Sequence, residues 1–257
     1  MIKMVACSVL TGYLDEYLNI KNIKDKWMLN GLVVEGKKDV NKIICGVDPS
    51  MELFERAVKE HADMIITHHG LIPREPTPIT HTLYKRLKIL MDNSISLYVA
   101  HIPLDMHPEI GNNAQFFKLL NIPIKEKFGE VDGEIISFIG ELEKEMSMDE
   151  LVQSIEKIVN DKCSHIYRFG NNKVKRIAFI SGSAPYEIAQ AIAKDVDVYI
   201  TGSIDSIPYL LAKDAKINFI AIGHHSSETL GIIALADVIK NRFNIEAKFI
   251  DIKTGGI

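Results

Sequence analysis

The sequence predicts an α/β protein built from two similar α/β domains, in which mostly parallel sheets are flanked by helices. Two observations support this fold class. Short apolar runs alternate with amphipathic stretches along most of the chain, an order typical of parallel sheets. The two halves of the chain also resemble each other. We expect a first domain over residues 1–125 and a second over residues 126–257, with the polar region Pro123–Glu134 at the boundary.

The expected elements follow from the apolar periodicity. The expected strands are Lys42–Val47, Met64–Thr67, Ile95–Ala100, Glu134–Leu142, Val174–Ser181, Val196–Thr201, Ile217–Ile222 and Glu246–Ile250. The expected helices cover residues 4–20, 51–60, 83–92, 111–120, 148–159, 185–194 and 207–213, and a last helix ends near Arg242. The segment Trp27–Leu32 is expected to form a turn or loop.

Several side chains are candidates for capping these helices. Asp48 or Ser50 is expected to cap the helix over residues 51–60, and Ser226 is expected to cap the last helix. Gly111-Asn112-Asn113 opens another helix, and a capping Asn is favoured there over an anion site at the helix N-terminus.

Motifs of the first half recur in the second half. The matching pairs are Cys45–Pro49 with Ser181–Pro185, Ala62–Thr67 with Val196–Thr201, and Tyr98–Asp105 with Ala221–Glu228. Any two βαβα units are alike to some extent, but the shared Asp before the strand, the shared Thr at its end and the His-x3-carboxylate spacing favour an internal duplication. Two such domains facing each other would bring their strand ends to one interdomain cleft, a common place for a site.

Composition excludes several classes of protein. The chain has 257 residues, 47% of them hydrophobic and 25% charged, as in average globular proteins. Its 30 basic and 34 acidic residues give a net charge of −4, which provides no overall footprint for nucleic acid or an anionic membrane. Only three cysteines occur, widely spaced, which indicates a reducing compartment without disulfides. No apolar run approaches the ~20 residues of a membrane span, so we expect no membrane partner and a cytoplasmic location.

Metal-type side chains follow three of the expected strands. The three sets are His68-His69, His101 with Asp105, and His224-His225 with Glu228. The carboxyl ends of strands are where open α/β sheets bind ligands. Imidazole nitrogens and carboxylate oxygens without thiolates suit Zn, Fe, Mn, Co or Ni better than Ca or Mg. One such set is more often structural, whereas three at equivalent positions predict a metal site.

The number of candidate ligands indicates two divalent ions per chain. Four protein ligands close a structural site, and more are available here. Pairs of ions about 3.5–4 Å apart are common in hydrolytic centres. Glu228 is the candidate bridging carboxylate, and the adjacent His68 and His69 point different ways, so each can serve a different ion. His101 and His225 are then candidates for orienting ligands or facing the substrate.

Taken together, these motifs resemble the GTP cyclohydrolase 1 type 2 homolog family, also called the NIF-three-like proteins. The resemblance spans nearly the whole chain and rests on Trp27 with Asn30-Gly31-Leu32, Thr67–Gly70, His101–Asp105, Gly111–Gln115, Thr201-Gly202 and Gly223–Glu228. It implies two similar α/β domains with a dinuclear metal site between them, the short form without an inserted middle domain, and a toroidal homohexamer. Carried over residue by residue, the implied metal ligands are His68, His69, Asp105, His224 and Glu228. Where the family often has an acidic residue after the tryptophan, this chain has Met28 and Leu29.

Two functional hypotheses follow. The first is a metal-dependent hydrolase that acts at C8 of a GTP-like nucleotide, with His101 or His225 as the catalytic residue that moves protons. The alternative is a ring-forming metal-binding protein that binds DNA or a protein partner without turnover. A basic pocket of phosphate size beside the metals favours the first hypothesis, and a basic lining of the ring favours the second.

Overall fold

The computed structural model describes residues 4–72, 74–75 and 77–254, which form two compact units. The first unit comprises the described part of Met1–Leu104 together with Ile232–Ile252, and the second comprises Asp105–Gly231 with the described residues from Lys253 onward. The chain passes between the units inside α4 (Ile102–Asp105), inside α10 (Thr229–Phe243) and again between Ile252 and Lys253.

The first unit contains a five-stranded, mostly parallel sheet. Its order is β13 (Glu246–Phe249), β4 (Lys42–Gly46), β5 (Met64–Thr67), β6 (Ser96–Val99) and β2 (Gly31–Val34). The first four strands run parallel, and β2 pairs antiparallel with β6 at the edge. The strands β1 (Val5–Ala6) and β3 (Asp39–Val40) form a separate antiparallel pair.

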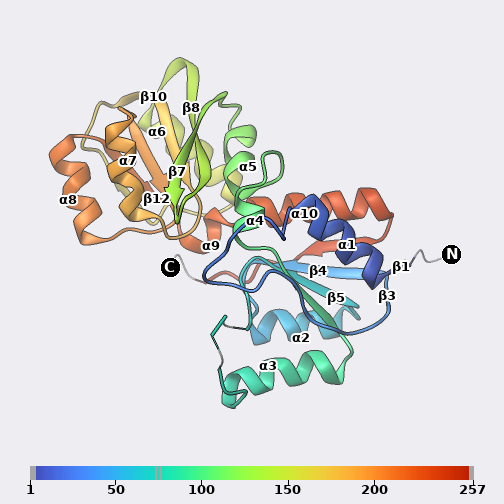
Figure 1. Ribbon diagram of the computed structural model, residues 1–257. Helices are drawn as coiled ribbons and strands as arrows, with labels where there is room; N and C mark the ends of the chain where they lie inside the picture. Colours follow the sequence, from blue (N-terminus) through green and yellow to red (C-terminus); the bar gives the residue numbers. More distant parts are fainter. Residues whose placement is uncertain (1–3, 73, 76, 255–257) are drawn as a thin grey trace. The chain divides into compact units, whose positions relative to one another are not determined.

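Helices cover both faces of this sheet, which explains why its central strands are continuous apolar runs. Figure 1 shows α2 (Met51–Lys59) and α3 (His81–Asp92) on one face, and α1 (Cys7–Tyr17) with the larger part of α10 on the other. Leu53 and Phe54 of α2 pack into a buried cluster with residues from all three central strands.

The second unit contains a six-stranded mixed sheet. Its order is β7 (Ile124–Val131), β8 (Glu134–Ser147), β10 (Lys173–Ile180), β11 (Val198–Thr201), β12 (Asn218–Ala221) and β9 (His165–Tyr167). The strands β10, β11 and β12 run parallel, and the others pair antiparallel.

Each face of this sheet also has its own helices. The helices α5 (Asn112–Leu119) and α6 (Met148–Val159) contribute to a cluster that includes Val198 and Ile200 of β11. The alternate residue Tyr199 points to the other face, where its hydroxyl donates to the carbonyl of Ala184. That face carries η1 (Pro185–Glu187), α7 (Ile188–Ala193) and α8 (Ser206–Ala215), as Figure 1 shows.

The prediction of an α/β fold with mostly parallel central strands flanked by helices is confirmed, but three expectations about the chain path are wrong. The expected boundary region folds as strand β7, which pairs with β8 through a two-residue turn at Asp132-Gly133, both with positive φ. The last strand, β13, pairs with β4 of the first unit, so residues 126–257 do not form one unit. The expected turn over residues 27–32 enters strand β2 at Gly31.

The hydrogen-bond register changes how the two halves correspond. Both sheets contain three parallel strands in chain order with an antiparallel edge strand after the third. Gly46 pairs with Thr67, whereas Ile180 pairs with Thr201. Gly46 therefore corresponds to Ile180, two residues before the Gly182 that the sequence match aligned with it.

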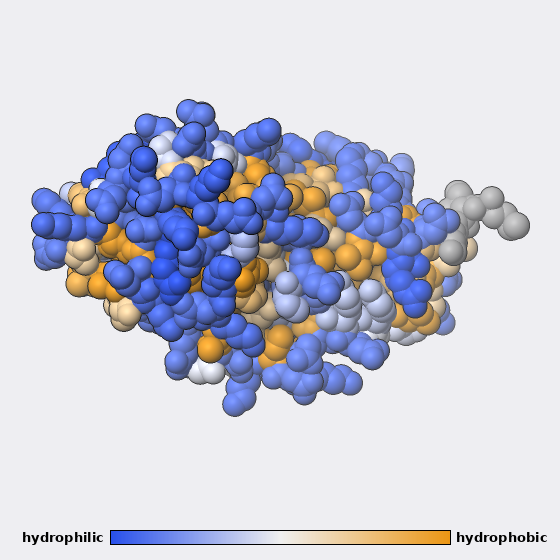
Figure 2. Space-filling view, turned by 90° about the horizontal axis from the view of Figure 1, so that it is seen from above, coloured by the Kyte–Doolittle hydropathy of each residue, from blue (hydrophilic) through white to orange (hydrophobic). Residues whose placement is uncertain are grey.

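One face of the molecule is mostly hydrophilic. Figure 2 shows hydrophilic residues over most of the face that it presents, with hydrophobic residues scattered between them. Among the described residues, no helix has the length and apolar character needed to cross a membrane.

Candidate metal site

In the first unit, three histidines meet at the carboxyl ends of two neighbouring strands. His68 and His69 follow β5, and His101 comes two residues after β6, which runs parallel to β5. The ring centroids are 5.0 Å apart for His68 and His69, 5.1 Å for His68 and His101, and 5.6 Å for His69 and His101. One ring nitrogen from each lies within 4.8 Å of the other two. The sheet register therefore brings three predicted site residues together.

Each of these rings has its Nδ1 held by an oxygen atom. The partners are the carbonyl of Ala100 for His68 at 2.8 Å, Oδ1 of Asp48 for His69 at 2.7 Å, and Oδ2 of Asp25 for His101 at 2.7 Å. A carbonyl or carboxylate oxygen only accepts, so Nδ1 of each ring donates and Nε2 carries the lone pair of the neutral form. This tautomer is the one that metal-binding histidines commonly adopt when a carbonyl or carboxylate orients them.

Asp25 is buried and receives several hydrogen bonds. Its Oδ1 accepts from the backbone N–H of Trp27 at 2.9 Å and of Met28 at 3.0 Å, and its Oδ2 accepts from the side chain of Asn30 at 2.8 Å. Burial acts to raise the pKa of Asp25, but the bonds from His101, Asn30 and Met28 together bring that pKa below its usual range. The side chain is therefore a carboxylate at neutral pH.

Asp48 is the second carboxylate that holds a histidine ring. The capping position of α2 is taken by Ser50, whose side chain accepts from the N–H of Leu53. Of the two expected caps, Ser50 is therefore confirmed, and Asp48 instead orients His69.

In the second unit, the side chains of His224 and Glu228 lie in contact. His224 begins the short helix α9 (His224–Ser227), and its Nε2 lies 3.2 Å from Oε2 of Glu228. Glu228 is only 3% exposed, and His225 is also buried. The expected cap of the next helix is wrong, because the hydroxyl of Ser226 bonds the carboxylate of Asp161 instead.

Asp105 is also buried in the second unit. Its Oδ1 accepts from the hydroxyl of Ser181 and from the side-chain amide of Asn112, both at 2.8 Å. Asn113 bonds the N–H of Ser181 at 2.9 Å. The expectation of a capping Asn is therefore wrong, since Gly111 occupies the cap and both Asn side chains hold other groups.

Gly182 permits the close approach of Glu228. It follows Ser181 with φ of +69°, and a Cβ built there would lie 2.4 Å from Oε1 of Glu228 and 3.6 Å from Nε2 of His224. The N–H of Gly182 also donates to the hydroxyl of Ser227 at 2.8 Å. A side chain at this position would displace the carboxylate, and the positive φ also favours glycine there.

Sequence reasoning missed the residues that orient the predicted ligands. The sequence does not indicate Asp25, Asn30 or Ser181 as site residues, because each lies outside the histidine motifs and contacts a site residue far away in the chain. The segment that contains Asn30 is expected as a turn or loop, but nothing in its sequence indicates His101 as a partner.

The donor groups fit a divalent transition metal. The described groups are imidazoles and carboxylates, which suit zinc and its first-row neighbours. Cys45 belongs to neither group of possible ligands among the described residues, and complete burial raises the pKa of its thiol to about 12. The structure thus contains His and Glu groups with the composition of a metal site.

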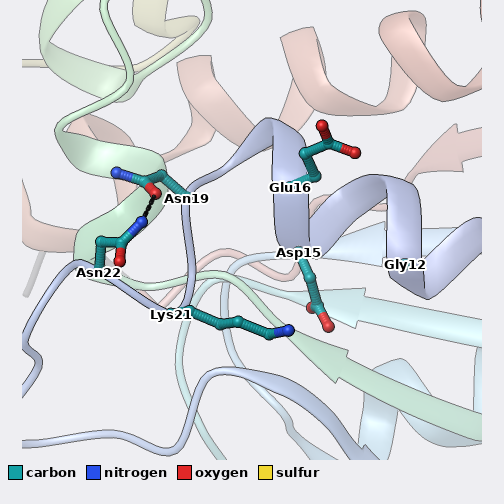
Figure 3. A pocket seen from close by; sticks show the side chains of 6 residues that line it. All are labelled: Gly12, Asp15, Glu16, Asn19, Lys21 and Asn22. Carbon is teal, nitrogen blue, oxygen red and sulfur yellow. Dashed lines mark hydrogen bonds between the residues drawn. The ribbon is translucent and has the colours of Figure 1, made fainter.

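A separate pocket of about 390 Å³ lies in the first unit (Figure 3). It is lined by Gly12, Asp15, Glu16, Asn19, Lys21 and Asn22. Figure 3 shows the ends of the Asp15 and Lys21 side chains turned toward the same space, while Asn22 bonds Asn19. None of these residues belongs to the predicted site.

The fold and these groups define an α/β protein of two units with candidate metal-binding histidines and carboxylates. The sequence profile of the Duf34/NIF3 (NGG1p interacting factor 3) family matches residues 5–255, so the chain belongs to this family. The family resemblance inferred from the motifs is confirmed.

Individual relatives agree with this assignment. A protein of Pyrococcus horikoshii named GTP cyclohydrolase 1 type 2 homolog is 42% identical over 96% of this chain and 98% of its own length. A protein of the same name from Archaeoglobus fulgidus is 36% identical over 94% of this chain and 96% of its own length.

Solved structures have the same fold. The structure of protein ybgI, titled as of unknown function, has a TM-score of 0.90 at 35% identity and covers 97% of this chain and 99% of its own. The structure of TTHA1606 from Thermus thermophilus has a TM-score of 0.87 at 29% identity and covers 98% of this chain and 100% of its own.

Proposed function

We propose that this protein is a hydrolase that depends on two divalent metal ions and acts on a GTP-like nucleotide. The observation that supports it most is the convergence of three histidines whose Nδ1 atoms are all held by oxygen acceptors. The name that the relatives from Pyrococcus horikoshii and Archaeoglobus fulgidus share supports the nucleotide substrate.

The proposed ligands are His68, His69, Asp105, His224 and Glu228, with Glu228 as the bridging carboxylate. We also propose that the ligands of both units bind the same pair of ions. A divalent ion in such a site supplies a nucleophile at neutral pH by lowering the pKa of bound water, and it stabilises developing negative charge.

The protein's own residues have three tasks in this proposal. The oxygen acceptors of His68 and His69 fix which ring nitrogen faces the ions. Ser181 and Asn112 orient the carboxylate of Asp105 through its Oδ1. Either His225 or His101 is the proposed proton carrier, because an imidazole nitrogen can both accept and donate a proton.

The proposal also covers the oligomeric state of the protein and the evolutionary origin of its two units. We propose a toroidal homohexamer in the cytoplasm, with the two units derived from an internal duplication. The shared order of three parallel strands and an antiparallel edge strand supports the duplication. A contact that occurs in both units also supports the duplication. Oδ2 of Asp63 accepts from the N–H groups of Asn41 and Lys42, and Oδ2 of Asp197 accepts from those of Lys175 and Arg176.

The test is turnover of GTP by protein reconstituted separately with Zn²⁺, Mn²⁺ and Fe²⁺. Products are identified by chromatography and mass spectrometry, with Glu228→Ala as the inactive variant and the exposed His165→Ala as the matched control. We expect turnover by the wild type and by His165→Ala only. Full metal loading without turnover of any purine nucleotide would refute the hydrolase and favour a metal-binding protein that binds DNA or a protein partner.

A further inference from the structure

We propose that His101 is a third histidine ligand beside His68 and His69, and that Asp25 and Asn30 are its positioning residues. This inference rests on the proposed metal dependence, but not on turnover. It replaces the proton-carrying role of His101 with a ligand role.

The first argument is the clustering of three imidazoles. One ring nitrogen each of His68, His69 and His101 lies within 4.8 Å of the other two. The Nδ1 bonds leave Nε2 of each neutral ring as the nitrogen that can bind a cation. Three imidazoles are a common ligand set for zinc.

The second argument is the way His101 is held at two points. Its Nδ1 donates to Oδ2 of Asp25, and its backbone N–H donates to Oδ1 of Asn30 at 2.7 Å. Asn30 in turn donates to the same Oδ2 of Asp25 at 2.8 Å. One closed set of hydrogen bonds therefore fixes both the main chain and the ring of His101.

The third argument is that the loop holding Asp25 is itself ordered by that carboxylate. Oδ1 of Asp25 accepts two backbone N–H groups, from Trp27 and Met28, so the loop turns around the buried side chain. The Trp27 ring stands edge-on to His101, with ring centroids 6.2 Å apart. The ring of His101 is thus fixed at its Nδ1, its backbone and its edge, as the ring of a metal ligand must be oriented.

Asp48 offers an internal comparison. It holds His69 as Asp25 holds His101, each through Nδ1 at 2.7 Å. If both rings are ligands, removing the charge of either carboxylate should weaken metal binding to a similar extent, about 10–100-fold.

The experiment uses the full chain and Co²⁺ or Zn²⁺ alone as the probe. Metal affinity is measured by chelator competition, and the ligand set by the visible absorption of bound Co²⁺, for wild type, His68→Ala, His101→Ala, Asp25→Asn and Asp48→Asn. His165→Ala is the control for loss of an imidazole. We expect His101→Ala to lower the affinity for one ion by at least about 100-fold and to change the Co²⁺ spectrum. Asp25→Asn and Asp48→Asn should each lower the metal affinity by about 10–100-fold.

The outcomes separate this inference from the proposed function. If His68→Ala loses metal while His101→Ala keeps the affinity and spectrum of the wild type, the ligand role of His101 is refuted and the metal dependence stands. If both variants bind as the wild type does, both proposals fail.

A measurement on the wild type avoids any folding defect of the variants. Ring ¹⁵N spectra recorded with and without Zn²⁺ should show Nδ1 of His101 protonated in both, and Nε2 shifted by the metal. A proton on Nε2 in the zinc-loaded protein overturns the inference.

Discussion

The contact between Gly182 and Glu228 leads to a prediction about stability and metal binding together. In Gly182→Ala, the new Cβ would lie 2.4 Å from Oε1 of Glu228, whereas ordinary contacts begin at 3.4 Å. The carboxylate must therefore move by roughly 1 Å, the difference between these distances. The residue also has φ of +69°, a conformation that costs an L-residue about 1–2 kcal/mol.

The expected cost of Gly182→Ala is about 2–5 kcal/mol, because about 1–3 kcal/mol of overpacking adds to the backbone strain. Gly133→Ala is the matched control. Gly133 has φ of +84° in the turn between β7 and β8, and nothing lies within 4 Å of its added Cβ. That variant should lose only about 1–2 kcal/mol.

The assays are urea unfolding followed by circular dichroism, and metal affinity by chelator competition. Gly182→Ala should bind the metal at least about 10-fold more weakly, as expected when the orientation of a ligand is disturbed. Gly133→Ala should bind it as the wild type does. Equal stability losses in the two variants, with metal affinity unchanged in both, would refute the assigned role of Gly182.

Three further predictions concern the first unit. Gly12→Ala should raise stability by about 0.5–1 kcal/mol in urea unfolding, because Gly12 lies within α1 and nothing is within 4 Å of the added Cβ. Tyr98→Phe should lower stability by about 1–3 kcal/mol in the same assay, because the buried hydroxyl donates to the Asp15 carboxylate at 2.8 Å. Burial acts to raise the pKa of Asp63, but bonds from the Lys37 ammonium and two backbone N–H groups lower that pKa overall. The Asp63 carboxylate therefore stabilises the folded state fully above about pH 4, and this stabilisation is lost as the pH falls through the lowered pKa of Asp63. Asp63→Asn should thus flatten the acid limb of a stability–pH curve, and an unchanged limb would contradict this assignment.

Elements with a strong local pattern were predictable from the sequence. The helix expected over residues 148–159 is observed as α6 with the same bounds, because Ser147 and Glu150 form a capping box beside an apolar stripe. The strand β5 also has its expected bounds, because it is a short apolar run buried on both faces.

Elements that depend on distant partners were not predictable in the same way. Most of β7 is polar and lies at the sheet edge, so its pairing with β8 left no apolar run in the sequence. β13 was expected as a strand, but its partner β4 lies some 200 residues earlier in the chain. No local pattern indicates which sheet such a strand joins.

In the candidate site too, features with a local sequence pattern were predictable, and features that depend on distant partners were not. The histidines were predicted because they follow apolar strands, and the strand register then determines which of them meet. The acceptors were not predicted, because Asp25 contacts His101 from a loop without periodicity, and Asp48 is also compatible with a helix cap.

The most direct test of the account is the metal content of protein purified without added metal, by mass spectrometry, for wild type and Glu228→Ala. Both proteins are also measured after reconstitution with Zn²⁺, Mn²⁺ and Fe²⁺ and removal of excess ion. The account predicts about two ions per chain in the wild type, as in dinuclear hydrolytic centres, and loss of at least one in Glu228→Ala. Metal at background level in the wild type even after reconstitution would contradict it.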